Sequence, residues 1–298
     1  MRELVFPALL ALAACSGSES DTPVKATDEP KAIEFDTAVL ATSEPGDNPC
    51  MREEFEGVAL THCIADPKRH RILMTLGPEG GAPYRGMGKF AADVAEREPD
   101  VVFAMNGGMF DESGQPIGLY VQNGRQLKDA NTAKGRGNFH LLPNGVFYGT
   151  GGTWAVAATE AYLEQIEERP SFATQSGPML VIDGKLHPKI DEDGESRKIR
   201  NAVGVDQEGF AHFVISEAPL SFGKLARYYR DELKVANALY LDGTVSALFN
   251  PADARMDAGP PLGPLIVVEA KPESAAETGR AERAQTDEAD ENDEENAK

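Results

Sequence analysis

The stretch that decides the fold is Val101–Gly108, which reads VVFAMNGG. Its apolar residues make a run of strand length, and the run ends on an asparagine and two glycines. Glycine lets a backbone approach a ligand closely, so this ending is typical of the edge of an active site. A second apolar run, Ala238–Leu241, stops in a similar way at Asp242 and Gly243. We therefore expect Asn106 and Asp242 to lie at the tips of two core strands.

A helical pattern precedes each tip. Apolar residues recur at helical spacing between Gly88 and Pro99, and again from Gly223 to Leu233. This repetition has two interpretations. The chain contains two structurally related halves that present their tips to a shared cleft, or two ordinary helix and strand successions look alike.

The remaining turn residues in the sequence predict short antiparallel hairpins. Turn residues separate short apolar runs at four places, Asn123-Gly124, Asn144-Gly145, Asp183-Gly184 and Asp206–Gly209. The second of these would join strands at Phe139–Leu142 and Val146–Tyr148. Helices are expected near Gly86–Arg97, Thr159–Arg169 and Phe222–Lys234. We predict one α+β or mixed α/β domain over residues 32–268, built on a mixed, hairpin-rich sheet with about three helices.

The N-terminus predicts export. Residues 1–14 combine Arg2, an apolar stretch and the small residues Ala13 and Ala14 directly before Cys15. This pattern resembles the lipobox of bacterial lipoproteins, which implies cleavage before Cys15 and acylation of its thiol. Ser16 after it favours the outer membrane, so the resemblance implies a lipid-anchored protein facing the periplasm, with a polar linker at 15–31. An ordinary secretory signal with an incidental cysteine is the alternative.

Export to an oxidising compartment indicates a role for the other two cysteines. Cys50 and Cys63 are two thiols in an oxidising compartment, so we predict that they form a disulfide that closes a short loop. A metal site or a nucleophilic cysteine would need a basic or histidine context. His62 adjoins Cys63, but adjacent strand residues point to opposite faces.

Charge and missing motifs exclude several functions. The formal net charge is −20, which disfavours nucleic acid and anionic lipid surfaces as partners. The acidic tail 269–298 cannot bury enough apolar surface to fold, and weak calcium binding there is an unsupported alternative. The sequence contains no phosphate-binding loop, no G-x-S-x-G motif and no paired histidines, so we predict no metal and no cofactor.

Four motifs together resemble the phosphodiester glycosidase domain family. They occur in order between Phe55 and Val268, and they are Asn106–Phe110, Ser176–Leu186, Arg200–Asp206 and Ala238–Ser246. The resemblance implies cleavage of a sugar–phosphate glycosidic bond in a glycan or glycolipid. Two departures are present, because Thr244 and Val245 replace glycines and Asn201 replaces a threonine. β-branched residues cannot adopt some glycine backbone angles, so the loop after Asp242 could hold a different ligand or none.

The chemistry assigns roles to these residues. A phosphate monoester is a good leaving group, so the reaction mainly needs phosphate recognition and stabilisation of a cationic sugar. Arg200 would offer a planar fork to phosphate oxygens. Asp242 would stabilise the cation, attack it or activate water, and Asn106 would bind a hydroxyl or orient Asp242. Glu217, with Asp111 behind it, is the candidate second carboxylate. Backbone and side-chain contacts to the substrate are expected from Gly107, Gly108, Ser176, Gly177, Asn201, Gly243 and Thr244.

Each of these residues also has a purely structural interpretation. An aspartate before glycine can cap a turn, an arginine can pair with a surface carboxylate, and an asparagine can satisfy turn amides. Two functional classes therefore stay open. The protein is an exported hydrolase of sugar-1-phosphodiesters, or it is a non-catalytic carbohydrate-binding or envelope-assembly lipoprotein that only holds a glycan.

Overall fold

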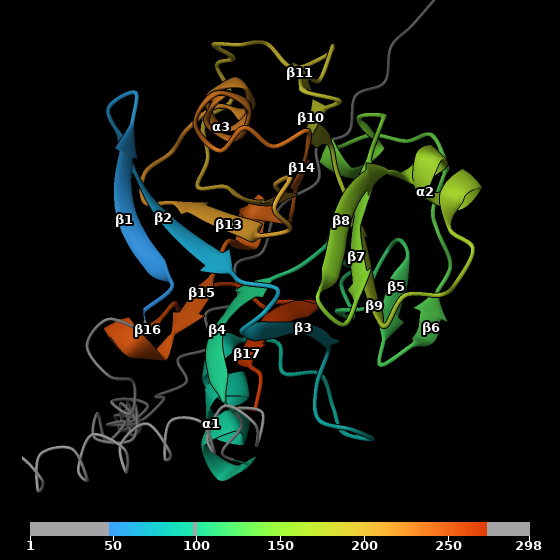
Figure 1. The fold of residues 1–298 in the computed structure, drawn as a ribbon, viewed down its shortest axis with the longest axis vertical. Coiled ribbons are helices and arrows are strands. Elements are labelled where there is room, and N and C mark those ends of the chain that lie inside the picture. The colour runs from blue at the N-terminus through green and yellow to red at the C-terminus, as the bar shows by residue number, and fades with distance from the viewer. Residues whose placement is uncertain (1–47, 98–99, 273–298) are drawn as a thin grey trace, which may run out of the picture. The chain divides into compact units, whose positions relative to one another are not determined.

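The computed structural model describes residues 48–97 and 100–272 (Figure 1). These residues belong to the unit Thr37–Lys298, and the other unit, Met1–Asp36, lies outside the described residues. The predicted signal peptide, Cys15, the linker 15–31 and the tail from residue 273 onward also lie outside them.

The largest sheet has seven strands, and a helix covers its outer face. Their order is β1 (Cys50–Phe55), β2 (Val58–Ala65), β13 (Ala211–Ser216), β12 (Asn201–Val205), β14 (Asn237–Tyr240), β10 (Met179–Ile182) and β11 (Lys185–Leu186). Helix α3 (Phe222–Arg227) begins after Ser221, whose side chain accepts a hydrogen bond from Lys224 N as an N-cap. A π-helical turn, Tyr228–Glu232, continues it. The apolar side chains of α3 and this turn pack on the sheet.

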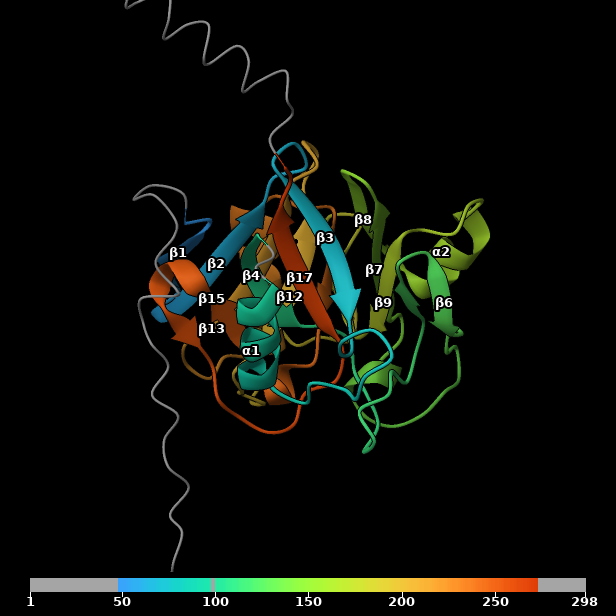
Figure 2. The same cartoon turned by 90° about the horizontal axis from the view of Figure 1, so that it is seen from below.

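Two five-stranded sheets complete the fold, each with one helix on its outer face (Figures 1 and 2). The first is covered by α1 (Met87–Arg97) and has the order β16 (Arg255–Met256), β15 (Leu248–Asn250), β4 (Val101–Asn106), β17 (Leu265–Ala270) and β3 (His70–Thr75). The second is covered by α2 (Thr159–Gln165) and has the order β6 (Arg125–Lys128), β5 (Tyr120–Gln122), β9 (Phe172–Ser176), β7 (Gly145–Thr150) and β8 (Thr153–Ala158).

The main core lies where the inner faces of the three sheets meet. Phe103 of β4, Phe147 of β7 and Phe213 of β13 are all fully buried. The rings of Phe103 and Phe213 lie 5.4 Å apart between centroids, and those of Phe147 and Phe213 lie 5.7 Å apart. Burial of each such side chain stabilises the fold by about 1.5–3 kcal/mol. One aromatic ring from each sheet therefore ties the three sheets together, and this contact fixes where their strand ends lie.

The predicted α+β class and the three helices are confirmed in the described chain, and so are three of the hairpins. Turns at Asn123-Gly124, Asp183-Gly184 and Asp206–Gly209 join β5 to β6, β10 to β11 and β12 to β13. Asn123 and Asp183 have φ of 51° and 48°, as two-residue hairpin turns require. The strands differ from a single mixed sheet, because every named pair is antiparallel and the pairs divide among three sheets.

The predicted hairpin at Asn144-Gly145 is wrong. Phe139 lies in a short 3-10 helix, Asn138–His140, rather than in a strand. Asn144 Nδ2 donates to Phe139 O at 3.0 Å, and its Oδ1 accepts from Thr159 Oγ1 at 2.7 Å. The asparagine side chain thus joins the 3-10 helix to the start of α2 instead of forming a turn. The hairpin partner of β7 is β8, which follows a turn at Gly151 with φ of 59°.

The predicted disulfide between Cys50 and Cys63 is present. The two residues face each other across the β1 and β2 ladder, with their Cα atoms 3.9 Å apart. They lie 13 positions apart in the chain, and a cross-link of this loop length is expected to contribute about 3 kcal/mol. Separately, no helix within residues 48–97 and 100–272 combines the length and the apolar character needed to cross a membrane.

Candidate functional site at the strand ends

The ends of β4 and β14 meet although the strands belong to different sheets. Asn106 Nδ2 donates to Asp242 O at 2.8 Å, and Asp242 N donates to Gly107 O at 3.2 Å. Asn106 is only 1% exposed. The structure therefore places the two residues singled out from the sequence side by side.

Asn201, at the start of β12, completes a buried polar cluster with this pair. Its Nδ2 donates to Asn106 Oδ1 at 2.9 Å, and its backbone oxygen accepts from Leu241 N at 3.1 Å. Ala247 N donates to the same Asn106 Oδ1 at 2.9 Å, and Ser246 Oγ lies 3.3 Å from Asn201 Oδ1. Sequence analysis did not assign a role to Ser246, although it closes the fourth motif. The two asparagines hold the strand ends together beside Asp242.

The end of β9 forms the third side of the site. Gly108 N donates to Thr174 Oγ1 at 3.1 Å, and a Cβ atom on Gly108 would lie 2.3 Å from Gln175 O. Only glycine fits there. Thr174 and Ser176 share a face of the strand because strand side chains alternate. Ser176 is fully buried, and its Oγ has no hydrogen-bond partner. A buried hydroxyl without a partner costs free energy, so a ligand atom beside it would be favourable.

The backbone amides of Gly107 and Gly108, which follow β4, already donate hydrogen bonds within the protein. Gly107 N donates to Pro264 O at 2.7 Å, and Gly108 N donates to Thr174 as described above. The predicted role of these two amides as phosphate donors is therefore not supported by the geometry. Their function is to let β4 approach its neighbours closely.

Asp242 lies in an electrostatic setting suited to proton transfer. Burial raises the pKa of its carboxyl group, and the hydrogen bond from Thr244 N to Asp242 Oδ1, at 3.3 Å, only partly opposes that shift. Gly243–Val245 form a 3-10 turn without positive φ angles, so Thr244 and Val245 fit where the family has glycines. A half-buried carboxylate with a raised pKa at converging strand ends is a typical general base.

Arg200 precedes β12 and faces helix α3. Ala202 of β12 pairs with Tyr240 of β14, and this is the last pair in the register of the two strands. Arg200 is 1% exposed, and its guanidinium stacks 3.6 Å from the ring centroid of Phe222. Burial lowers its pKa, and the Tyr240 hydroxyl opposes that shift.

The donors of Arg200 are engaged with the protein itself. Nε donates to Leu220 O at 3.0 Å, and Nη2 donates to Ser196 O at 2.9 Å. Nε and Nη2 are thus held by backbone oxygens, and the predicted fork toward phosphate oxygens stays a prediction. The Arg200 guanidinium lies over the ring of Tyr240. The Tyr240 hydroxyl packs closely on Gly243, because a Cβ atom on Gly243 would lie 2.4 Å from that hydroxyl oxygen. Arg200 thus supports the Asp242 loop from behind.

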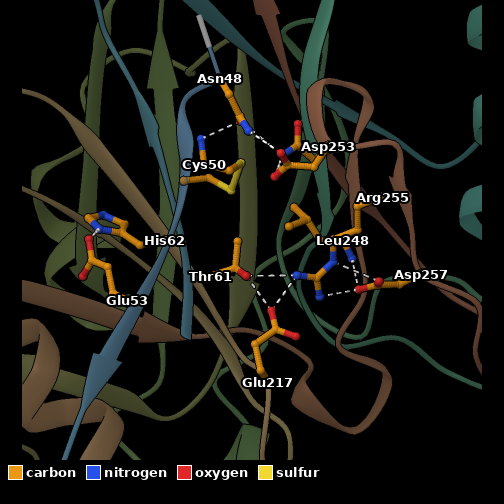
Figure 3. Close-up of a disulfide and its surroundings, with 12 residues drawn as sticks. Asn48, Cys50, Glu53, Thr61, His62, Glu217, Leu248, Asp253, Arg255 and Asp257 are labelled. Carbon is orange, nitrogen blue, oxygen red and sulfur yellow. Dashed lines mark hydrogen bonds and ion pairs between the residues drawn. A yellow bond between two sulfur atoms is a disulfide. The ribbon is translucent and has the colours of Figure 1, made fainter. Parts of the chain in front are cut away.

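Glu217 and Asp111 are not brought to the strand ends. Glu217 Oε1 accepts from Thr61 Oγ1 and from Arg255 Nη1, both at 2.5 Å (Figure 3). Burial raises the pKa of Glu217, but these two hydrogen bonds, together with the charges of Arg255 and Arg52, lower it overall. Asp111 caps an exposed turn through Ser113. Within the described chain, no hydrogen bond or ion pair joins either carboxylate to Asp242. Arg255 is distant from Glu217 in the sequence and forms an ion pair with it. No local sequence pattern predicts this ion pair.

We expect Arg200→Lys to reduce the free energy of unfolding by about 2–3 kcal/mol, because lysine loses the planar stack and leaves a backbone carbonyl unsatisfied. Chemical denaturation measures this change. Arg97→Lys is the matched control, because the exposed Arg97–Asp93 pair is worth about 1 kcal/mol at most. Unchanged stability of Arg200→Lys with a large rise in KM for a phosphodiester would instead indicate a direct phosphate contact.

The described residues contain no group of three or more His, Cys, Asp or Glu side chains placed to hold a metal ion.

Comparisons with known proteins show a family and a fold. The sequence matches the phosphodiester glycosidase family (NAGPA) over residues 99–283. It is 36% identical over 206 residues to "Uncharacterized protein YigE" of Escherichia coli (strain K12), covering 69% of this chain and 80% of that protein. The fold is similar to the zebrafish N-acetylglucosamine-1-phosphodiester alpha-N-acetylglucosaminidase catalytic domain auto-inhibited by its pro-peptide. The TM-score is 0.51 and the identity 15%, over 74% of this chain and 82% of that one.

Proposed function

Because the chain belongs to the phosphodiester glycosidase family, we propose that it is an exported hydrolase that cleaves the glycosidic bond of a sugar-1-phosphodiester. The observation that carries the proposal is the meeting of three strand ends around Asp242, whose raised pKa suits it to proton transfer. Its substrate is a glycan or glycolipid in which a phosphate diester is attached to the anomeric carbon.

Substrate recognition is assigned to the groups that the fold leaves available. Ser176 Oγ is buried without a partner, so it donates to a phosphate or sugar oxygen that arrives beside it. Gly177 follows it, and a Cβ there would lie 2.7 Å from Asn144 Cβ, so the backbone must run closely at this point. The asparagine pair fixes the position of Asp242 relative to Ser176 rather than binding substrate itself.

The reaction needs only one carboxylate at the site, which acts as a base. Water attacks the anomeric carbon while the bond between that carbon and the phosphate oxygen breaks. Asp242 accepts a proton from the attacking water, and the phosphate monoester leaves with the bonding electron pair. A phosphate monoester leaves readily, so a second carboxylate acting as an acid is not required, and Glu217 can stay bound to Arg255.

Turnover in ¹⁸O-labelled water tests this reaction class. Sugar-1-phosphate diesters, including nucleotide sugars, would be incubated with the full mature protein, with and without a chelator. Glycosidic cleavage places the label on the sugar and leaves the released phosphate unlabelled. Label in the phosphate would show phosphoester hydrolysis and contradict the proposal.

The non-catalytic alternative has one observation in its favour. Thr244 N caps the Asp242 carboxylate, as it would in a purely structural turn. A protein of this kind would bind the same substrates without turnover. Binding of intact phosphodiester together with the absence of any product across the panel would favour this alternative.

We also propose that Cys15 anchors the mature protein to the bacterial outer membrane on its periplasmic side. The support is the sequence pattern before Cys15. Cys15→Ser should release the protein from the membrane fraction, and a variant that stays membrane-bound would contradict the anchor.

A further inference from the structure

A chain of buried polar side chains crosses the largest sheet, separate from the strand-end site. His62 of β2 and His212 of β13 are 3% and 8% exposed, and His62 Nε2 lies 2.9 Å from His212 Nδ1. The outer nitrogen of each ring faces a carboxylate. Figure 3 shows His62 facing Glu53. His62 Nδ1 lies 3.1 Å from Glu53 Oε1, and His212 Nε2 lies 3.1 Å from Asp206 Oδ2. Tyr228 donates its hydroxyl proton to the other oxygen of Glu53.

The protons of two neutral rings are too few for these contacts. The three contacts, one between the rings and one to each carboxylate, need one proton each. A neutral imidazole carries one N–H, so two neutral rings supply only two protons. If both outer nitrogens donate to carboxylates, the inner nitrogens of His62 and His212 face each other with lone pairs alone. That contact is repulsive unless a cation lies between them.

The geometry identifies this cation as a proton. A separation of 2.9 Å between donor and acceptor is that of an ordinary hydrogen bond. Zinc would need about four ligands in tetrahedral geometry, and the described chain offers no group of three His, Cys, Asp or Glu side chains for a metal. We propose that the pair binds one additional proton, which lies in the contact between His62 Nε2 and His212 Nδ1.

Ionisable groups surround the pair. Burial lowers the pKa of His62, Glu53 opposes that shift, and His212 lowers the pKa further. Burial raises the pKa of Glu53, but hydrogen bonds from Tyr228 and His62, together with the charges of the two histidines, lower it overall, which keeps Glu53 ionised. Burial and Glu53 raise the pKa of Tyr228, with a smaller contribution from Glu232, so Tyr228 keeps its proton. Asp206 faces His212 Nε2.

The bound proton makes the stability of the protein depend on pH through the contacts between β1, β2 and β13. In the unfolded chain a histidine has an ordinary pKa of about 6.5 and is neutral above it. A proton held more tightly in the folded pair stabilises the protein fully below that pH. The stabilisation is lost as pH rises through the value at which the folded pair releases it. Over that interval the unfolding equilibrium constant rises by about tenfold per pH unit.

Ring nitrogen NMR of the ¹⁵N-labelled protein at about pH 7.5 tests the proposal directly, since long-range ¹H–¹⁵N spectra distinguish protonated from unprotonated ring nitrogens. We expect protons on three of the four ring nitrogens of His62 and His212. Two protonated and two unprotonated nitrogens would overturn the proposal, because the proton would then lie on a carboxylate or be absent. A change in these signals on adding one equivalent of zinc would overturn it in favour of a metal.

The pH dependence of unfolding gives a second, independent measurement. Wild type should lose stability with rising pH more steeply than His212→Gln, by about tenfold per unit in the unfolding constant. His140→Gln is the matched control, because His140 lies in the 3-10 helix Asn138–His140, outside the largest sheet, and the variant should behave as wild type. Equal slopes for all three proteins would contradict the proposal. If His212→Gln does not fold, the NMR measurement on wild type still decides the question.

Discussion

Replacing Asp242 with asparagine is expected to lower kcat on a sugar-1-phosphodiester by a factor of about 10³ while substrate binding is retained. Asparagine has nearly the same shape, but it cannot accept the proton of the attacking water. Steady-state kinetics together with a direct binding measurement on the same preparation would separate these two effects. A variant that keeps wild-type kcat would remove Asp242 from the chemistry.

The stability of this variant provides its control. Folding raises the pKa of Asp242, so the ionised carboxylate destabilises the folded state once the pH exceeds the raised value. Asp242→Asn should therefore be as stable as wild type at neutral pH, or more so, and the loss of turnover cannot come from unfolding. The same shift predicts the pH profile of wild type. Activity should fall on acidification at a pH above the ordinary aspartate pKa of about 3.9, because the base must be ionised.

Replacing Asn106 with alanine is expected to reduce the free energy of unfolding by about 3 kcal/mol or more. The change leaves Asp242 O and Ala247 N without their side-chain partner in a buried setting, and it leaves Asn201 Nδ2 only its bond to the backbone oxygen of residue 106 at 3.2 Å. Each unsatisfied buried group costs about 1–3 kcal/mol. Activity should fall as well, because the end of β14 loses its attachment to β4. Chemical denaturation and steady-state kinetics on the same variant measure both effects.

Asn237→Ala is the matched control for Asn106. Asn237 accepts a single hydrogen bond from Asp183 N at the exposed end of β14. Its loss should cost about 1 kcal/mol and leave kcat unchanged. If Asn106→Ala were no more destabilising than Asn237→Ala, the asparagine would not join the two strands in the way the structure indicates.

Local features of the fold were predictable from the sequence. Helical spacing located α1, α2 and α3 because amphipathic periodicity is a property of neighbouring residues. The Asn123-Gly124 and Asp183-Gly184 turns were predictable for the same reason, since their backbone angles depend on two adjacent residues. The hairpin at Asn144 was mispredicted because its side chain bonds to Thr159, fifteen positions away.

The three-sheet arrangement and part of the site depend on contacts between distant segments. The pairing of β2 with β13 and of β4 with β17 joins strands far apart in the chain, which no local pattern encodes. Arg200 shows the same limit for the site. The sequence placed it near Asp242, but the direction of its guanidinium depends on Phe222 and Leu220, which come from another element.

Glu217 was a reasonable candidate by position alone. It follows β13 at a strand end, as Asp242 follows β14. Its carboxylate is held by Arg255 and Thr61 next to the disulfide, and Arg255 is held in turn by Asp257 (Figure 3). A cavity of about 470 Å³ adjoins this group, lined by Arg52, Thr61, Asp253 and Arg255. It is the nearest alternative place for a polar ligand.

A crystal structure of Asp242→Asn with an intact sugar-1-phosphodiester tests the central claim most directly. The account predicts that the anomeric carbon lies beside the side chain of residue 242 and that an oxygen of the ligand accepts a hydrogen bond from Ser176 Oγ. Ligand bound instead in the cavity beside Arg52 and Arg255, with Ser176 Oγ still without a partner, would contradict it.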